Sequence, residues 1–535
     1  MEVPMLVGYV SDERYVSVPD VPMEFEDADG NSIEAHSRAT GAVYAQVTPG
    51  TEYRVTLACP GYGFKSIYMI PIEGNPYHFR LLTDCLLGYM WPKWVKGGEK
   101  SEFRVHAVEQ YKLELWRYGW NKEFIKTVGW YDEHGPRATM QITPDGDYTR
   151  TGVQWNKQGF TNPHHFQYLE APERTGLYYL HAKGESGNFF SFPWIVAPKE
   201  PQAQIAVLAS NINWNAYNNF GGRSNYIHPD EFPPKPTVNA RYDLKRYTDP
   251  KHRNYDAEDY APLSFDRPEP INFIPEDDQA TDPIEGRAGC HIAPAEWRFL
   301  GWMEREGNAY DLYAETQLHS GILNLDAYRI LIITTHPEYW SKHMYYTLKS
   351  WVFERGGRLM YLGGNGLNCE VEFLDEYTMK VKNGSPQSLD RPGDDIESRF
   401  HIYNESEANL LGVAFTGTGI MTSAPYRVID ADHWVFSGCG VKLGDIFGEA
   451  CLHMRVPGGA SGHETDKVTV SSPKNVELVA KGTNIDDGGA EIVVHEPGNG
   501  GMVFSVGSIT YPSSILVDDV VSRITTNVIK RFLSN

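Results

Sequence analysis

Hydrophobic residues in the first 198 positions recur in short segments with rough alternation, the pattern of half-buried β-strands. Turn signals such as Pro49-Gly50 and Gly97-Gly98 separate these segments at intervals of roughly ten residues, a spacing typical of sandwiches. The clearest segments are AVYAQV (42–47), YRVTLA (53–58), SEFRVHAV (101–108) and YKLELWRYG (111–119). We therefore predict two β-sandwich domains, a small one at residues 1–83 and a second at 84–198.

After residue 203 the apolar residues form continuous runs, as expected of parallel strands covered on both faces. Helical spacing appears at 295–307 and between Lys342 and Arg355, where Gly356-Gly357 gives a helix stop. The runs are QIAVLAS (204–210), RILIITT (329–335), RLMYLGG (358–364) and the segment 500–510, which precedes a closing amphipathic helix. Residues 199–535 are thus predicted to form an α/β domain with a parallel sheet and at least one right-handed βαβ unit.

Composition and charge narrow the class of protein. With 48 basic and 70 acidic residues, the net charge of −22 argues against nucleic acid or an anionic membrane as a partner. Aromatic residues make up 13% of the 535 residues, and 32 of them are tyrosines. We expect most of these rings to fill cores and interfaces.

Cysteine spacing and hydropathy indicate the compartment. The six cysteines are scattered without a CxxC pair, which suits a reducing environment and disfavours a disulfide framework or a cysteine zinc site. The chain shows no apolar run of the roughly 18 residues that a membrane span needs. Its first residues lack the basic and apolar regions of a signal peptide. We therefore expect a cytoplasmic, soluble protein.

Chemistry-bearing residues follow three of the predicted parallel strands. Ligands of such sheets bind beyond the carboxyl ends of the strands. Tyr217 lies in the polar, aromatic loop after 204–210, His336 and Glu338 in HPEYW follow 329–335, and Asn365 follows 358–364 between two glycines. These side chains should meet at one edge of the sheet, and their convergence predicts a functional site there.

Each of these residues also has a purely structural interpretation. Tyr217 would pack within its loop, Glu338 would favour a following helix dipole, and His336 would end a strand as a satisfied histidine. The glycines around Asn365 would serve a tight turn. Taken singly, each structural interpretation is the better one; the shared edge of the sheet favours a site.

The combination of HPEYW after a buried strand and LGGNG after the next strand resembles the large (β) subunit of N,N-dimethylformamidase. The resemblance extends from about residue 84 to the C-terminus. It implies a doubly wound catalytic domain similar to class I glutamine amidotransferases, and a mononuclear ferric iron bound by two tyrosines and one glutamate. The implied activity is hydrolysis of the C–N bond of a small amide such as an N-substituted formamide.

The resemblance also implies residue roles. Glu338 of HPEYW is the glutamate ligand and Tyr217 of WNAYNN the first tyrosine ligand. Tyr260, ahead of Arg267-Pro268, is the second, with Tyr255 as its competitor. His336, Asn365 and Glu464 of SGHETDK correspond to the residues that act around the metal.

The chemistry of this set is consistent. Two phenolates and a carboxylate are hard anionic ligands that suit a highly charged cation, whereas zinc more often takes His or Cys. Glu464 would serve as general base for water and then protonate the leaving amine, while His336 or Asn365 would donate to the developing oxyanion. Tyrosinate ligands stabilise the ferric state, which favours hydrolysis over redox chemistry.

Missing motifs exclude other hydrolases. The chain has no GxSxG elbow and no HExxH, and the GGNG turn carries Asn365 where an amidotransferase-like fold would place a cysteine. Cys369, four residues later, is the one candidate nucleophile for a metal-free amidase. That hypothesis is therefore disfavoured.

Two parts of the chain depart from the formamidase. Residues 1–83 resemble a small transthyretin- or carboxypeptidase-regulatory-like sandwich, and the proline-rich connection 223–285 is long enough to be functional and to shape the substrate pocket. The formamidase works with a separate small subunit, and nothing in this sequence indicates whether such a partner exists here. By analogy we expect a homo-oligomer. The alternative function is a non-catalytic protein that binds carbohydrate or protein through its aromatic residues.

Overall fold

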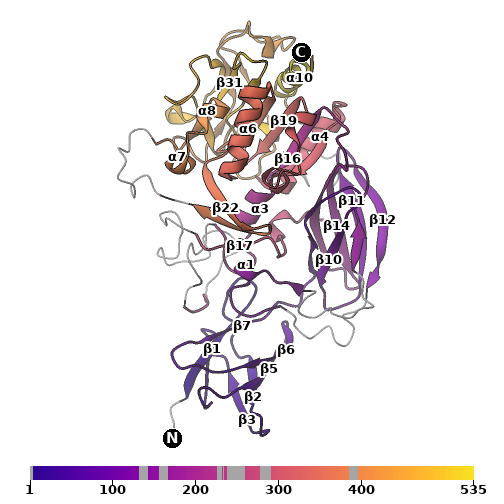
Figure 1. Ribbon diagram of the computed structural model, residues 1–535, viewed down its shortest axis with the longest axis vertical. Coiled ribbons are helices and arrows are strands. Elements are labelled where there is room, and N and C mark those ends of the chain that lie inside the picture. The colour runs from indigo at the N-terminus through magenta and orange to yellow at the C-terminus, as the bar shows by residue number, and fades with distance from the viewer. Residues whose placement is uncertain are drawn as a thin grey trace.

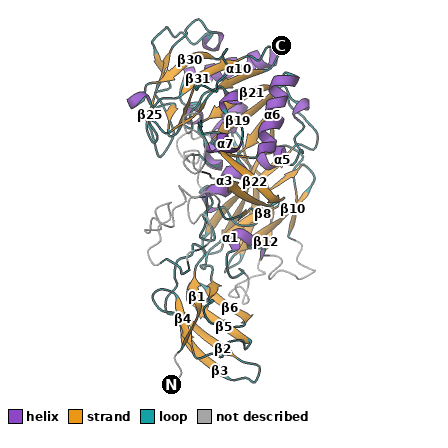
Figure 2. Ribbon diagram, turned by 60° about the vertical axis from the view of Figure 1, so that its left-hand side comes forward, coloured by secondary structure: helices purple, strands orange, loops and turns teal. Residues whose placement is uncertain are grey.

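The computed structural model is rich in β-sheet and elongated, with the N-terminal strands at one end and the helices gathered at the other (Figures 1 and 2). It describes residues 4–131, 143–155, 167–225, 232, 234–237, 260–276, 291–382, 384 and 396–534. The predicted β-rich, sandwich-like organisation of the first 198 residues is confirmed within these ranges.

The N-terminal strands form two sheets that enclose one apolar core. The alternation in β5 explains this arrangement, because Tyr53, Val55 and Leu57 are buried while the residues between them face outward. One sheet has the order β4 (Ala42–Ala45), β1 (Met5–Ser11), β7 (Tyr77–Arg80), and the other β3 (Ser32–His36), β2 (Pro22–Glu26), β5 (Tyr53–Cys59), β6 (Gly63–Met69).

A second pair of sheets encloses a separate core between Leu86 and Val196. The smaller sheet has the order β13 (Tyr168–Glu170), β10 (Lys100–His106), β8 (Leu87–Trp91). The larger has the order β12 (Lys122–Tyr131), β11 (Tyr111–Tyr118), β14 (Gly176–Gly184), β15 (Phe189–Ala197), β9 (Trp94–Lys96). The separate cores agree with the predicted pair of sandwiches, while the domain boundaries at residues 83 and 198 stay predictions.

A nine-stranded sheet organises the remainder of the described chain. Its first five strands are parallel and have the order β18 (Asp311–Ala314), β16 (Ile205–Ala209), β19 (Ile330–Thr335), β21 (Arg358–Gly363), β32 (Met502–Ser505). In chain order this is 2-1-3-4-5, one of the two common doubly wound arrangements. The resemblance to amidotransferases beyond this strand order stays a prediction.

The other four strands of this sheet are antiparallel, which the sequence did not predict. They are β31 (Glu491–His495), β30 (Glu477–Gly482), β26 (Tyr426–Val428) and β27 (Ile446–Phe447). A separate four-stranded sheet has the order β17 (Leu263–Ser264), β23 (Thr378–Lys382), β22 (Cys369–Asp375), β20 (Tyr339–Trp340). Two two-stranded sheets pair β24 (Ala414–Thr416) with β29 (Thr465–Lys467) and β25 (Ser423–Ala424) with β28 (Ser461–Gly462). Strands this short give little periodicity to read.

The helices pack into the core that surrounds the parallel strands. The predicted helix between the third and fourth parallel strands is confirmed as α6, whose stop Gly356 has φ 76°. None of the helices in the described ranges is long and apolar enough to cross a membrane. The helices are α1 (Tyr148–Thr151), α3 (Asn211–Tyr217), α4 (Ala293–Arg305), α5 (Glu315–His319), α6 (Lys342–Arg355), α7 (Arg399–Tyr403), α8 (Ala408–Leu411), α9 (Tyr511–Ser514) and α10 (Asp519–Ser534).

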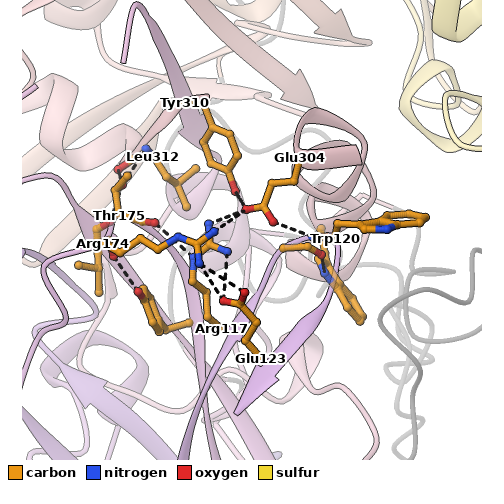
Figure 3. A network of polar contacts seen from close by, with 12 residues as sticks. Arg117, Trp120, Glu123, Arg174, Thr175, Glu304, Tyr310 and Leu312 are labelled. Carbon is orange, nitrogen blue, oxygen red and sulfur yellow. Dashed lines mark hydrogen bonds and ion pairs between the residues drawn. The ribbon is translucent and has the colours of Figure 1, made fainter. Parts of the chain in front are cut away.

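A buried ion pair joins the second sandwich to α4 (Figure 3). Arg117 of β11 is 3% exposed, and its Nη2 lies 2.5 Å from Oε1 of Glu304. The same carboxylate accepts hydrogen bonds from the Trp120 amide at 2.9 Å and the Tyr310 hydroxyl at 3.2 Å. Burial alone would raise the pKa of Glu304, but Arg117 lowers it. The carboxylate therefore stays charged in this joint.

A second buried carboxyl group, on α4, binds α3 and the residue before it by hydrogen bonds. Glu296 of α4 is 2% exposed and accepts hydrogen bonds from the Trp214 indole at 2.8 Å and the Ser210 amide at 3.3 Å. Burial raises the pKa of Glu296 to about 8. The hydrogen bonds from Trp214 and Ser210 lower this pKa, but by less than burial raises it. Glu296 is therefore largely protonated at neutral pH in the folded chain.

Replacing Glu304 by Gln should destabilise the protein by about 2–3 kcal/mol, because buried Arg117 loses the closer of its two carboxylate partners. This loss is smaller than the roughly 3–5 kcal/mol of a fully buried pair, because Glu123 remains 3.8 Å from Arg117 and Glu304 retains 20% side-chain exposure. Urea unfolding at pH 7 measures the difference. Glu306→Gln, at the exposed end of the same helix, is the control and should change stability by less than about 0.5 kcal/mol. Equal effects of the two substitutions would contradict the role of the pair.

Replacing Glu296 by Gln should make the protein less sensitive to rising pH. The folded-state pKa lies above the unfolded value of about 4.5, so wild-type stability is full below that value and falls by up to about 1.4 kcal/mol per pH unit as the pH rises towards 8. Urea unfolding at pH 5 and pH 8 should show a smaller difference in Glu296→Gln than in wild type. Glu354→Gln, at an exposed position, is the control. Parallel pH profiles of wild type and Glu296→Gln would contradict the raised pKa of Glu296.

Candidate functional site

The candidate site lies where the order of the parallel strands reverses. Strands β16 and β19 are neighbours there, and ligands of doubly wound sheets bind beyond the carboxyl ends at such a position. α3 follows β16 and ends at Tyr217, whereas HPEYW follows β19. The prediction of a loop around Tyr217 is wrong, because buried Ile212, Trp214 and Ala216 pack 211–217 as a short helix.

A continuous line of polar contacts joins the predicted residues. The Tyr217 hydroxyl donates to Glu338 Oε2 at 2.9 Å. His336 Nε2 lies 3.4 Å from Glu338 Oε2 and 3.1 Å from Glu464 Oε2. Asn365 Nδ2 donates to the same Glu464 oxygen at 2.8 Å. The structure thus brings five of the six predicted residues into one cluster, although they lie up to 247 positions apart in the sequence.

The two carboxyl groups of this cluster differ in their electrostatics. Burial raises the pKa of Glu338, and the charge of Glu464 adds to this effect. Burial would also raise the pKa of Glu464, but His336 lowers it well below its usual range. Burial would lower the pKa of His336, but Glu464 and Glu338 raise it. The arrangement therefore favours an ionised Glu464 paired with a protonated His336.

Left-handed backbone occurs at or next to His336, Asn365 and Glu464 of the cluster. Thr335 before His336 has φ 66°, Asn365 has φ 49°, and His463 before Glu464 has φ 65°. Such conformations cost free energy in residues other than glycine and concentrate at functional sites. The turn after β21 also needs glycine, because a Cβ on Gly364 would lie 2.5 Å from the Glu464 carbonyl oxygen.

Asp466 holds this turn in place and was not predicted from the sequence. Its Oδ1 accepts the Asn365 amide at 2.8 Å, and its Oδ2 accepts the Tyr361 hydroxyl at 2.6 Å. Tyr361 in turn accepts the Gly366 amide at 2.7 Å. The one sequence feature that marks Asp466 is its position in a strand, two residues after Glu464.

Histidines were also missed near Tyr217. The ring of His291 lies 4.5 Å from that of Tyr217 and 5.4 Å from that of His336, measured between centroids. His463 follows at 5.6 Å from His291, and its Nδ1 lies 3.1 Å from Nε2 of His453. These histidines could not be predicted from the sequence, because His291 follows a long connection and belongs to no motif.

Tyr260 is buried with 4% exposure in the same core. Tyr260 and Glu338 are both among the groups that raise the pKa of Arg399, which burial alone would lower. The competing ligand Tyr255, like most of the predicted pocket-shaping connection 223–285, lies outside the described residues.

Residues 218–225, called here the site loop, connect the three predicted ligands. The Asn225 amide donates to the carbonyl of Ala216, next to Tyr217, at 2.8 Å. The Asn225 side chain donates to the hydroxyl of Tyr339, next to Glu338, at 2.7 Å. Arg223 donates to the carbonyl of Ala261, next to Tyr260, at 3.3 Å and to that of Pro262 at 2.7 Å.

Arg267 holds the site loop against α3. Its Nη1 donates to the Phe220 carbonyl at 2.7 Å, and its Nη2 donates to the Asn215 carbonyl at 3.0 Å. Arg267 is fully buried, so these carbonyls replace the water that the guanidinium has lost. The Arg-Pro pair that located Tyr260 in the sequence is thus part of the scaffold.

The donor set fits a hard, highly charged cation. In the described residues no group of three His, Cys, Asp or Glu side chains is placed to hold a metal ion. Tyr217 and Glu338 are in direct contact and buried Tyr260 belongs to the same core. Both ring nitrogens of His291 and Oδ1 of Asn365 are buried without a hydrogen-bond partner, which leaves polar groups for further ligands or substrate.

Cys369 has the properties of a core residue. It is fully buried, and burial raises the pKa of its thiol to about 12. A thiol with so little thiolate is a poor nucleophile. The metal-free cysteine hydrolase thus gains no support.

Comparison with solved structures gives only partial likenesses. A β-galactosidase from Rahnella sp. R3 aligns with a TM-score of 0.27 and 12% identity over 44% of this chain and 27% of that one. A β-galactosidase from Bacillus circulans sp. alkalophilus aligns with a TM-score of 0.26 and 11% identity over 44% of this chain. The chain spans about a quarter of the length of each of these enzymes.

Comparison by sequence is more informative. No curated protein sequence matches the chain. The family model described as N,N-dimethylformamidase beta subunit-like, C-terminal, matches residues 112–522, which include every residue of the cluster and Tyr260. The chain belongs to the N,N-dimethylformamidase beta subunit-like family.

Proposed function

We propose that this protein hydrolyses the C–N bond of a small amide, such as an N-substituted formamide, with a ferric ion held by Tyr217, Tyr260 and Glu338. The observation that carries the proposal is the contact line from Tyr217 through Glu338, His336 and Glu464 to Asn365. It supports the proposal because two of the three proposed ligands, Tyr217 and Glu338, lie in one contact line with the proposed base Glu464, within the matched family region.

When bound, ferric iron would supply Lewis acidity to an amide carbonyl and to water. The neighbouring residues then have separate tasks. The contact with His336 keeps Glu464 ionised, so that it takes a proton from the attacking water. The leaving amine needs that proton, and Glu464 is the group placed to return it. His336 or Asn365 would supply the N–H donor for the developing oxyanion.

Replacing Tyr217 by Phe should lower the iron content and weaken the phenolate-to-iron absorbance that we expect to colour the wild-type protein yellow to purple. The hydroxyl is lost while the ring is kept, so packing against His291 should change little. Elemental analysis together with the visible spectrum measures both effects. Tyr68→Phe, on a side chain that is 70% exposed, is the matched control. An unchanged iron content and spectrum in Tyr217→Phe would exclude Tyr217 as a ligand.

Replacing Glu464 by Gln should separate catalysis from metal binding. Iron should stay bound, whereas the rate of N,N-dimethylformamide hydrolysis should fall by about 10²- to 10⁴-fold, the usual contribution of a general base. Released dimethylamine reports the rate. Glu372→Gln, at an exposed position of β22, is the control. Full activity in Glu464→Gln would refute its role as base, and loss of iron would show that it is a ligand instead.

A further inference from the structure

The N-terminal sandwich contacts the site loop through one fully buried arginine. Arg80, the last residue of β7, is 0% exposed. Its Nη2 donates to the carbonyls of Asp12 at 2.9 Å and Gly221 at 2.8 Å, and its Nη1 donates to the carbonyl of Gly146 at 2.9 Å. One guanidinium therefore joins the sandwich to the segment before α1 and to the site loop.

Both backbone polar groups of Gly221, its amide and its carbonyl, are bound by the N-terminal sandwich. While its carbonyl accepts from Arg80, its amide donates to the carbonyl of Glu13 at 2.6 Å. Both glycines of the loop have positive φ and no room for a side chain. A Cβ on Gly221 would lie 2.3 Å from Cγ2 of Thr149, and one on Gly222 would lie 2.5 Å from Cβ of Tyr15.

A second attachment lies further along the chain after the site loop. Thr237 forms a parallel bridge with Val16: the Ser17 amide donates to the Thr237 carbonyl at 2.8 Å, and the Thr237 amide donates to the Tyr15 carbonyl at 3.1 Å. The ring of Phe232 stacks on that of Tyr15 with centroids 4.1 Å apart. Residues 12–17 thus bind the connection between Tyr217 and Tyr260 at two places.

These contacts lead directly to the proposed ligands. The site loop that Arg80 binds at Gly221 also contacts Ala216, Ala261 and Tyr339, each next to one of the proposed ligands. A shift of the loop would therefore move all of them. Misplacement of reacting groups by about 1 Å costs on the order of 100-fold in rate.

We propose that the N-terminal sandwich is a positioning module for the catalytic site, and that Arg80 is the positioning residue through which it fixes the site loop. The consequence for catalysis rests on the proposed function, whereas the consequence for the loop does not. Arg80 touches neither substrate nor the proposed ligands. It acts through the Gly221 carbonyl.

The test uses the full-length chain with Arg80→Lys. Lysine keeps the charge, but a single ammonium cannot replace the guanidinium fork that spans three carbonyls. In metal-free protein, we expect amide hydrogen exchange in residues 213–225 to become faster by about tenfold or more. In iron-loaded protein, we expect a weaker phenolate-to-iron band and a kcat lower by about 10- to 100-fold. Arg54→Ala, which breaks an exposed ion pair with Glu26 in the same sandwich, should leave all three unchanged.

Gly222→Ala tests the neighbouring contact of the site loop with Tyr15 of the sandwich, and it decides the matter if Arg80→Lys does not fold. Faster exchange confined to the site loop and its neighbours in either variant supports the inference. Unchanged exchange of 213–225 in a folded variant, or faster exchange in residues 4–80 alone, overturns it. If wild-type protein binds no iron and cleaves no amide, the proposed function fails, and the exchange measurement still decides the inference about Arg80.

Discussion

Buried guanidinium groups that bind backbone carbonyls are the interaction on which the rest of the site depends. Arg80, Arg223 and Arg267 are each at most 1% exposed, and burying such a charge is costly unless its N–H groups are satisfied. All three have the site loop or its neighbours as partners. The loop can therefore leave its position only by exposing or unpairing a buried cation, which makes a segment without regular secondary structure rigid.

Because this scaffold fixes the surroundings of the cluster, each of its carboxyl groups has a defined electrostatic environment. Two buried carboxyl groups contact the same ring nitrogen of His336, and their environments shift their pKa values in opposite directions. Both carboxyl groups contact the histidine, but Glu338 also accepts from a tyrosine hydroxyl whereas Glu464 accepts from an amide. In the proposed function Glu338 would hold the cation and Glu464 would transfer the proton, so that environment rather than residue type would divide the roles.

Much of this arrangement was predictable from the sequence, for identifiable reasons. The parallel strands were found because each is a continuous apolar run, and α6 because its stop is a glycine. His336, Glu338 and Asn365 were found because they directly follow such strands, and Tyr217 because it lies in the segment after the first of them. Glu464 and Tyr260 came from the family resemblance alone. Arg80, His291 and Asp466 could not be found, since their partners lie far away in the sequence and they follow no periodic pattern. The helical state of 211–217 was missed because its buried face is set by contacts with elements distant in the sequence, among them β17, α5 and β20.

The central claim is that the site loop brings Tyr217, Tyr260 and Glu338 to one cation. Anomalous diffraction at the iron absorption edge, from crystals of the full-length protein grown with ferric iron, tests this claim most directly. The account predicts a single strong peak within bonding distance of both tyrosine hydroxyl oxygens and the Glu338 carboxylate, with Glu464 beside it but not bound. A peak elsewhere in the chain, or one that lacks either tyrosine, would contradict it.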